Sequence, residues 1–311
     1  MGKLIVSASP HIHDGSSTSR IMLDVIIALS PAVIASTIFF GPRALLLIAV
    51  TVSVSVFSEL LSRRIMKRST DTYKDLSAVV TGLLLALSLP VTMPLWMASL
   101  GAIVAIVIVK QIFGGLGHNF VNPAIVGRLF LMFSYPIATN ASWSIPLPLQ
   151  GVDAVTQATP LIQISNQEPM NLWHLFLGMH GGSMGETSIL ALFIGGMYLV
   201  YRKIIRPTVP LIFIGTTCII VLLAGQNPLL HLMSGSLVFV AIFMATDYVT
   251  SPITAKGRIV FAVGCGFITA VIRLFGALPE GVSFAILIMN ILVPHIERVT
   301  VPKVFGDTTG G

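Results

Sequence analysis

The chain has 311 residues, of which 55% are hydrophobic and only 10% are charged. Soluble domains carry about 25% charged residues, so this composition excludes a soluble globular protein and indicates an all-α integral membrane protein. Basic residues at the cytoplasmic ends of membrane spans explain the net charge of +6 better than a nucleic-acid surface does. We therefore expect no nucleic acid among the partners.

Ten apolar stretches are candidates for transmembrane helices, although several fall short of the roughly 20 residues that a full span requires. The polar segment at 1–20 lacks an apolar core with a small-residue cleavage site. We expect it to be a cytoplasmic N-terminal segment, with the first span retained. The stretches cover 21–40, 44–62, 76–89, 95–112, 124–138, 187–201, 208–225, 229–246, 259–276 and 282–296.

The Lys and Arg residues predict the orientation of these spans. If the N-terminus is cytoplasmic and ten spans alternate, all of the 18 Lys and Arg residues except Arg43 and Arg273 fall on the cytoplasmic side. Basic loops stay in the cytoplasm, so we predict that the N-terminus and the tail at 299–311 are both cytoplasmic. No Lys or Arg occurs between Arg128 and Arg202, and the loop at 139–186 is predicted to lie outside.

Short segments recur at about half of the chain length. Residues 112–116 resemble 274–278, and a Thr-Gly or Ser-Gly pair followed by proline occurs in both 81–94 and 234–252. These matches indicate two repeats of five helices, and an odd number of spans makes the second repeat inverted in the membrane. Interrupted helices at membrane depth must face protein, a cavity or a ligand, so 81–94 and 234–252 are candidates for a pathway or cofactor site. The predicted repeats cover 21–138 and 187–298.

Four motifs carry a resemblance to a known family. They are Ser9-Pro10-His11, Gly117-His118-Asn119-Phe120-Val121-Asn122-Pro123-Ala124 with Gly127-Arg128, the string at 247–252, and the string at 279–285. Together they resemble the D subunit of the Rnf complex, which is related to the B subunit of the sodium-pumping NADH:quinone reductase. The resemblance implies a membrane subunit of a redox-driven pump that exchanges electrons between ferredoxin and NAD. Such a pump moves Na⁺ or H⁺ across the inner (cytoplasmic) membrane of a prokaryotic cell.

The same resemblance implies a covalent flavin. In that family a threonine that ends an Asp-x-x-Ser/Thr-Gly-Ala-Thr motif carries FMN through a phosphoester. The matching string here is Asp153-Ala154-Val155-Thr156-Gln157-Ala158-Thr159, with Gln157 in place of the usual glycine. We therefore expect FMN on Thr159, attached by a separate flavin transferase that recognises Asp153, Thr156 and Ala158. A tethered flavin suits a fixed electron relay, because it cannot diffuse away.

Three carboxylates, on Asp24, Glu59 and Asp247, lie within or at the ends of apolar stretches. Ionisable residues there are functional candidates by default, although Arg20, Arg64 and Lys256 are near enough in sequence to pair with them. Asp247 is the first choice for an ion site because it adjoins the predicted helix break.

Polar residues at 118–122 form a second candidate site. His118, Asn119 and Asn122 make a cytoplasmic turn that could hold a second, non-covalent flavin such as riboflavin, or contact another subunit. Trp143 and Trp173 flank the flavin motif, but tryptophan is also typical of the membrane surface. Cys218 and Cys265 stand alone, which favours core residues over a metal site.

The chain lacks a Gly-rich nucleotide-binding motif and a cysteine cluster. The NAD and ferredoxin sites are therefore expected in other subunits, with no complete active site in this chain. Two alternatives stay open. One is an inverted-repeat solute transporter or channel without a redox cofactor, and the other is the homologous subunit of the quinone reductase. The short segment before Ser9 argues against the latter.

Overall fold

All regular secondary structure is helical in the part of the chain that this computed structural model describes, residues 17–68, 75–140, 160–165, 172–178, 180–276 and 281–301. Four of these helices are long and apolar enough to cross a bilayer, and five further apolar helices in the described residues have 10–17 residues when α4 and η2 are taken together. The predicted all-α membrane protein is confirmed at this level. The four long helices are α1 (Thr18–Phe40), α2 (Pro42–Ile65), α13 (Ala255–Phe275) and α14 (Val282–Thr300).

The shorter helices follow the predicted stretches but are interrupted. The third stretch contains α3, which ends at Leu87, and the eighth is divided into α11 and α12 around Gly235. Thr81-Gly82 lies inside α3, so the break in this region comes several residues later than the Thr-Gly pair. The helices are α3 (Ser77–Leu87), α4 (Leu95–Ile103) continuing as the π-helix η2 (Val104–Gln111), α5 (Pro123–Ser134), α6 (Pro136–Asn140), α7 (Pro160–Ser165), α8 (Leu172–Leu177), α9 (Ile189–Tyr201), α10 (Thr208–Leu223), α11 (Pro228–Met233) and α12 (Leu237–Phe243).

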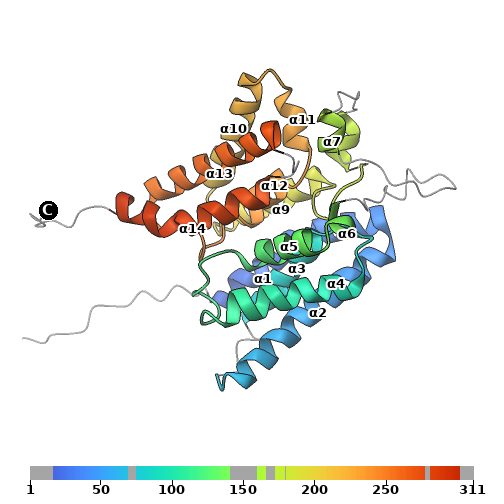
Figure 1. The fold of residues 1–311 in the computed structure, drawn as a ribbon, viewed down its shortest axis with the longest axis vertical. Coiled ribbons are helices and arrows are strands. Elements are labelled where there is room, and N and C mark those ends of the chain that lie inside the picture. Colours follow the sequence, from blue (N-terminus) through green and yellow to red (C-terminus); the bar gives the residue numbers. More distant parts are fainter. Residues whose placement is uncertain are drawn as a thin grey trace, which may run out of the picture.

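The helices gather into two groups with matching contacts. Figure 1 shows α1 to α6 on one side and α9 to α14 on the other. Within the first group α2 packs on α3 and α4, and α4 packs on α5; within the second, α10 packs on α12 and α13, and α13 packs on α14. Between the groups, α1 contacts α9 and α5 contacts α14. The contacts within the two groups thus follow the same pattern, and the helices of the first and last predicted spans of the groups, α1 with α9 and α5 with α14, meet across the boundary.

Glycine allows the closest of these approaches. A Cβ added to Gly195 of α9 would lie 2.0 Å from the carbonyl oxygen of Ala28 on α1, and one added to Gly266 of α13 would lie 2.7 Å from the carbonyl oxygen of Phe213 on α10. Small residues let helix backbones approach closely where van der Waals packing, rather than exclusion of water, drives association in lipid. A larger residue at either position would separate two helices of the bundle.

The C-terminal carbonyls of α3 are closed by a distant segment. The N–H of Gly185 donates to the carbonyl of Leu87 (2.6 Å), and that of Met184 donates to the carbonyl of Leu89 (3.1 Å). Carbonyls at a helix end need partners, and lipid supplies none. The end of the predicted outer loop is therefore buried against α3 instead of being surrounded by water, as Ser183 and Glu186 show by exposures of 0% and 3%.

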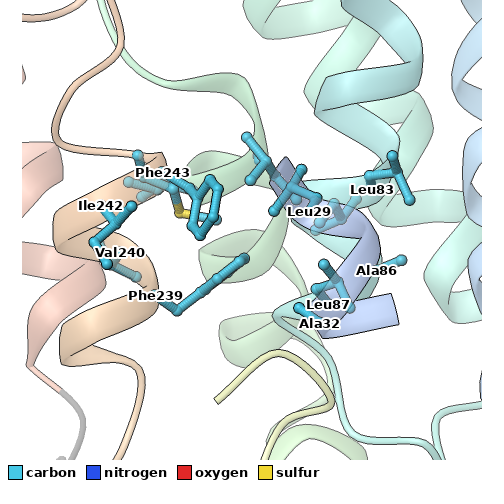
Figure 2. Close-up of a cluster of buried hydrophobic side chains, with 14 of the residues drawn as sticks. Leu29, Ala32, Leu83, Ala86, Leu87, Phe239, Val240, Ile242 and Phe243 are labelled. Carbon is cyan, nitrogen blue, oxygen red and sulfur yellow. The ribbon is translucent and has the colours of Figure 1, made fainter. Parts of the chain in front are cut away.

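An apolar core joins the two groups. Figure 2 shows Phe239 and Phe243 of α12 at one side of this core and Leu83 and Leu87 of α3 at the other, with Leu29 of α1 between them. On the outside, by contrast, large apolar side chains point away from the protein: Phe57 of α2 is 65% exposed, and further examples occur on α9, α10, α13 and α14. Soluble monomers rarely expose so much contiguous apolar surface, whereas a membrane covers it.

Candidate functional site

A pocket with a mainly apolar lining and several polar groups opens between the two groups of helices, at the end of the molecule where α1 and α3 begin and α9 ends. The space within it that water-sized atoms can occupy is about 90 Å³. Both groups contribute to its walls, and this is the end that carries most of the basic residues. Its polar lining residues are Ser77, Thr81, Lys110, Asn119, Asn122, Thr246, Asp247 and Tyr248.

Asn122 supplies one wall because it caps α5. Its side-chain oxygen accepts from the N–H groups of Ala124 (3.0 Å) and Ile125 (3.4 Å), and Pro123 occupies the first helical position. Asn-Pro at the start of a helix is a favourable pairing of cap and first residue. The buried Asn119 lies on the same wall, whereas His118 is exposed and lies outside the pocket lining. The predicted turn thus contributes two of its three candidates to the pocket.

Asp247 lies on the facing wall, in the linker that follows α12. One carboxylate oxygen accepts from the N–H of Val249 (3.3 Å) and the other from the hydroxyl of Thr250 (3.1 Å). These bonds close a turn of the kind that Asp commonly forms with its own backbone. The alternative of a pairing with Lys256 is not realised: Asp247 makes no ion pair with any residue that the structure describes.

A buried ion pair supports the pocket beside Asn119. The Nζ of Lys110 lies 2.8 Å from an oxygen of Glu59 and 2.7 Å from the hydroxyl of Ser77. The side-chain amide of Gln111 donates to the other oxygen of Glu59 at 3.0 Å, and the Nε of Arg63 lies 3.6 Å from it. Arg64, which sequence proximity suggested as a possible partner of Glu59, is exposed. Lys110 therefore brings a positive charge to the pocket that Glu59 neutralises.

Sequence reasoning missed Lys110 because it treated that residue as one more cytoplasmic charge. The signal was present: Lys110 ends an unbroken run of apolar residues, and Glu59 lies within another apolar stretch. Two opposite charges inside apolar spans commonly pair. The π-helix η2 turns both Lys110 and Gln111 into the protein, as such segments often do at functional positions.

Asp24 connects α1 to α9 near the same pocket. It accepts from the hydroxyl of Tyr198 (2.8 Å) and from a guanidinium nitrogen of Arg202 (3.1 Å). Arg20, the partner that sequence proximity suggested, stands one turn earlier on the same helix. The ion pair with Arg202 joins the first group of helices to the second, so Asp24 has a structural role that its position in sequence did not reveal.

The two arginines predicted on the opposite face both bind interrupted helices. Arg43 donates to the carbonyls of Val91 (3.0 Å) and Thr92 (3.3 Å), after α3. Arg273 donates to the carbonyls of His231 (2.6 Å) and Ser234 (3.0 Å), between α11 and α12. These bonds satisfy carbonyls that a continuous helix would satisfy by itself.

The predicted flavin-attachment residues Asp153, Thr156, Ala158 and Thr159 lie outside the described residues, as does Trp143. The next two residues, Pro160 and Leu161, are buried at the start of α7. Leu161 and Arg273 flank the same glycine, because a Cβ added to Gly235 would lie 2.7 Å from Leu161 and 3.1 Å from Arg273. A cation therefore lies near the residues that directly follow the motif.

The remaining candidates make no cluster. Trp173 of α8 is 72% exposed and its ring packs edge-on against Phe176. Cys218 and Cys265 are free thiols. Nowhere in the described ranges do three His, Cys, Asp or Glu side chains gather as metal ligands.

Comparison with known proteins shows similarity along nearly the whole chain. The sequence model described as the NQR2, RnfD, RnfE family matches residues 5–306. The chain is 48% identical to the D subunit of the Na(+)-translocating ferredoxin:NAD(+) oxidoreductase complex of Acetobacterium woodii, over 98% of this chain and 96% of that protein. It is 42% identical to the D subunit of the proton-translocating ferredoxin:NAD(+) oxidoreductase complex of Clostridium ljungdahlii, over 97% and 96%. The D subunit of the ion-translocating oxidoreductase complex of Stutzerimonas stutzeri is 38% identical, over 95% and 94%.

Proposed function

The chain belongs to the NQR2, RnfD, RnfE family, and from this membership we propose its place in a redox-driven pump. It is a membrane subunit of an ion-translocating ferredoxin:NAD⁺ oxidoreductase complex, as its relatives are by name. The observation that carries this assignment is identity of 42–48% over at least 96% of both chains. It also favours this function over a stand-alone transporter or the quinone-reductase subunit.

The proposed topology has ten spans in two inverted repeats of five, with both termini in the cytoplasm. Matching contacts within the two groups of helices support the repeats. The interrupted helices α3 and α12 occupy the third position of each repeat, where transporter folds of this kind place their binding sites. The pocket then opens to the cytoplasm, and the membrane is the inner (cytoplasmic) membrane of a prokaryotic cell.

The proposed cofactor is FMN, joined through its phosphate to Thr159 on the outer face by a separate flavin transferase. When bound, FMN supplies one-electron transfer to centres in partner subunits. The chemistry of Arg273 suits this group, since guanidinium is the preferred partner of phosphate and the loop at 139–186 contains no Lys or Arg. Leu161, two residues after Thr159, and Arg273 both lie beside Gly235. Arg273 therefore places a positive charge close in space to the segment that follows the motif.

The pocket is the proposed site of the coupling cation and of a second, non-covalent flavin such as riboflavin. Asp247 provides a carboxylate without an ion-pair partner among the described residues, and a hard cation binds such oxygen groups. Asn119 and Asn122 provide amides that can bond a heteroaromatic ring. Because Glu59 already neutralises Lys110, the pocket favours a neutral flavin over a phosphorylated one.

The chain depends on other subunits for the rest of the reaction. It carries no site for NAD or ferredoxin that its sequence shows, so those substrates bind elsewhere in the complex. Its own contribution is to hold the covalent FMN on the outer side of the membrane and the coupling cation on the cytoplasmic side. Names of its relatives include both Na⁺ and H⁺ as the transported ion, so the coupling ion must be measured.

The test is to remove the gene product and restore it. Membranes that lack this chain should lose ferredoxin-dependent NAD⁺ reduction and the accompanying ion transport, and the restored chain should return both. Mass spectrometry of the purified chain should show its mass plus FMN minus water. Retention of both activities without the chain would refute the assignment, and an unmodified mass would refute the cofactor alone.

A further inference from the structure

A buried amide on α14 joins the two walls of the pocket. Asn290 is 1% exposed. With its amide oriented to satisfy both neighbours, its nitrogen donates to the carbonyl of Thr250 (3.0 Å) and its oxygen accepts from the N–H of Asn122 (3.1 Å). Asn122 belongs to the linker before α5, and Thr250 belongs to the linker after α12. One side chain therefore holds a linker from each group of helices.

The connection continues to the pocket on both sides. The hydroxyl of Thr250 donates to Asp247 at 3.1 Å, and the side chain of Asn122 caps α5. Both Asn122 and Asp247 line the pocket. An unbroken series of hydrogen bonds thus runs from the carboxylate of Asp247, through Thr250 and Asn290, to Asn122 on the facing wall.

Other residues of α14 fasten the second linker without reaching the first group. Glu297 accepts from the N–H of Ile253 (3.0 Å), and the hydroxyl of Thr300 bonds that of Thr254 (2.7 Å). Spacings of seven and ten residues place Glu297 and Thr300 on the same face of the helix as Asn290. The linker after α12 is therefore already attached to α14 by Glu297 and Thr300. The bond from Asn290 to Asn122 adds a connection to the first group of helices, which these two attachments do not make.

Asparagine is a costly choice for packing alone. It is a poor helix former because its side chain competes for backbone bonds, and a buried amide is tolerated only when both of its ends are bonded. Leucine would fill the position with less penalty. The two bonds across the pocket are what the asparagine provides.

We propose that Asn290 is a positioning residue that sets the separation between Asp247 and Asn122, and through it the affinity of the pocket for its cation. This inference rests on the proposed cation site at Asp247. Occupation of that site moves the Thr250 turn, and Asn290 transmits the movement to the linker of the first group. Cation binding at Asp247 in the second repeat thereby changes the position of the Asn122 amide in the first repeat.

The experiment measures cation requirement in the assembled complex. Ferredoxin-dependent NAD⁺ reduction is titrated with Na⁺ at fixed pH, and with pH at fixed Na⁺, in membranes made leaky to ions. Asn290→Leu removes two hydrogen bonds, and we expect the half-maximal concentration of the coupling cation to rise roughly tenfold. Thr250→Val should shift it in the same direction. The double variant should shift it by less than the two single shifts combined, because the residues act in series.

Thr300→Val is the matched control. It loosens the same linker from the same helix but breaks no bond to the first group, so its cation requirement should equal that of the wild type. A wild-type value in Asn290→Leu would overturn the proposal, and so would an equal shift in Thr300→Val. If Asn290→Leu fails to assemble, Asn290→Ala, which removes the same two bonds with a smaller side chain, decides alone: a shift supports the proposal and its absence overturns it. A wild-type complex that responds to neither Na⁺ nor pH would instead refute the cation site itself.

Discussion

Replacing Lys110 by methionine should destabilise the protein by several kcal/mol, because it leaves a buried carboxylate without its main partner. Lys110 lies 2.8 Å from Glu59, and the two side chains are 1% and 2% exposed. At an effective dielectric constant of about 20, charges at this separation attract by about 6 kcal/mol. Removal of one partner from a buried pair costs about 3–5 kcal/mol. We expect the free energy of unfolding to fall by about 3–5 kcal/mol rather than by the full Coulomb energy, because Gln111 and Arg63 still contact Glu59.

The assay is heat stability of the detergent-solubilised complex, followed as the fraction of this chain that stays soluble at each temperature. The double variant Glu59→Gln/Lys110→Met should recover most of the loss, because neutral side chains of similar volume replace such pairs at little cost. The control is Arg64→Gln, an exposed neighbour, which should change stability by less than about 0.5 kcal/mol. The reasoning is refuted if Lys110→Met is as stable as Arg64→Gln, or if the double variant melts no higher than Lys110→Met.

The other predictions concern the flavin, the topology and the ion. Thr159→Val should abolish in-gel flavin fluorescence of this chain while the complex still assembles; fluorescence that persists, or that is lost only on changing Thr156, would remove the assignment. A cysteine introduced at Ser165 should react with an impermeant reagent in intact cells and one at Ser69 should not, and the reverse pattern would place the flavin motif in the cytoplasm. Asp247→Asn keeps the shape and removes the charge, so covalent FMN should be retained. Ion pumping should then fall by roughly tenfold or more, further than ferredoxin-dependent NAD⁺ reduction in leaky membranes, since charge neutralisation removes a direct attraction to the cation. If the number of ions pumped per electron is unchanged in Asp247→Asn, then Asp247 is not part of the ion path.

Local patterns identified several site residues separately, without showing that they meet. Asn119 and Asn122 were found in a polar turn, and Asp247 was found beside a helix break more than a hundred residues away. The structure brings all three to one pocket. It leaves His118 at the surface, outside the pocket lining. Sequence proximity suggested Arg20, Arg64 and Lys256 as possible partners of the carboxylates, whereas the ion pairs that the structure shows join Asp24 to Arg202 and Glu59 to Lys110.

The helical, membrane-embedded character of the chain was determined by the sequence itself. Hydropathy and charge are properties of short segments, and in lipid a segment must satisfy its own backbone groups, so apolar length alone predicts a helix. Proline and glycine likewise mark the helix breaks within a few residues. These features need no knowledge of what lies beside them in space.

Only the tertiary structure decided which buried groups are partners. Lys110 and Glu59 are 51 residues apart, and Asn290 meets Asn122 and Thr250 from a third element. The broken end of α3 is closed by Met184 and Gly185, which follow the predicted flavin motif in sequence. A buried polar group accepts any suitable partner within hydrogen-bonding distance, and that distance is fixed by how the helices pack. Since packing in a membrane depends on shape and small residues rather than on a hydrophobic pattern, the sequence alone does not encode these pairs in readable form.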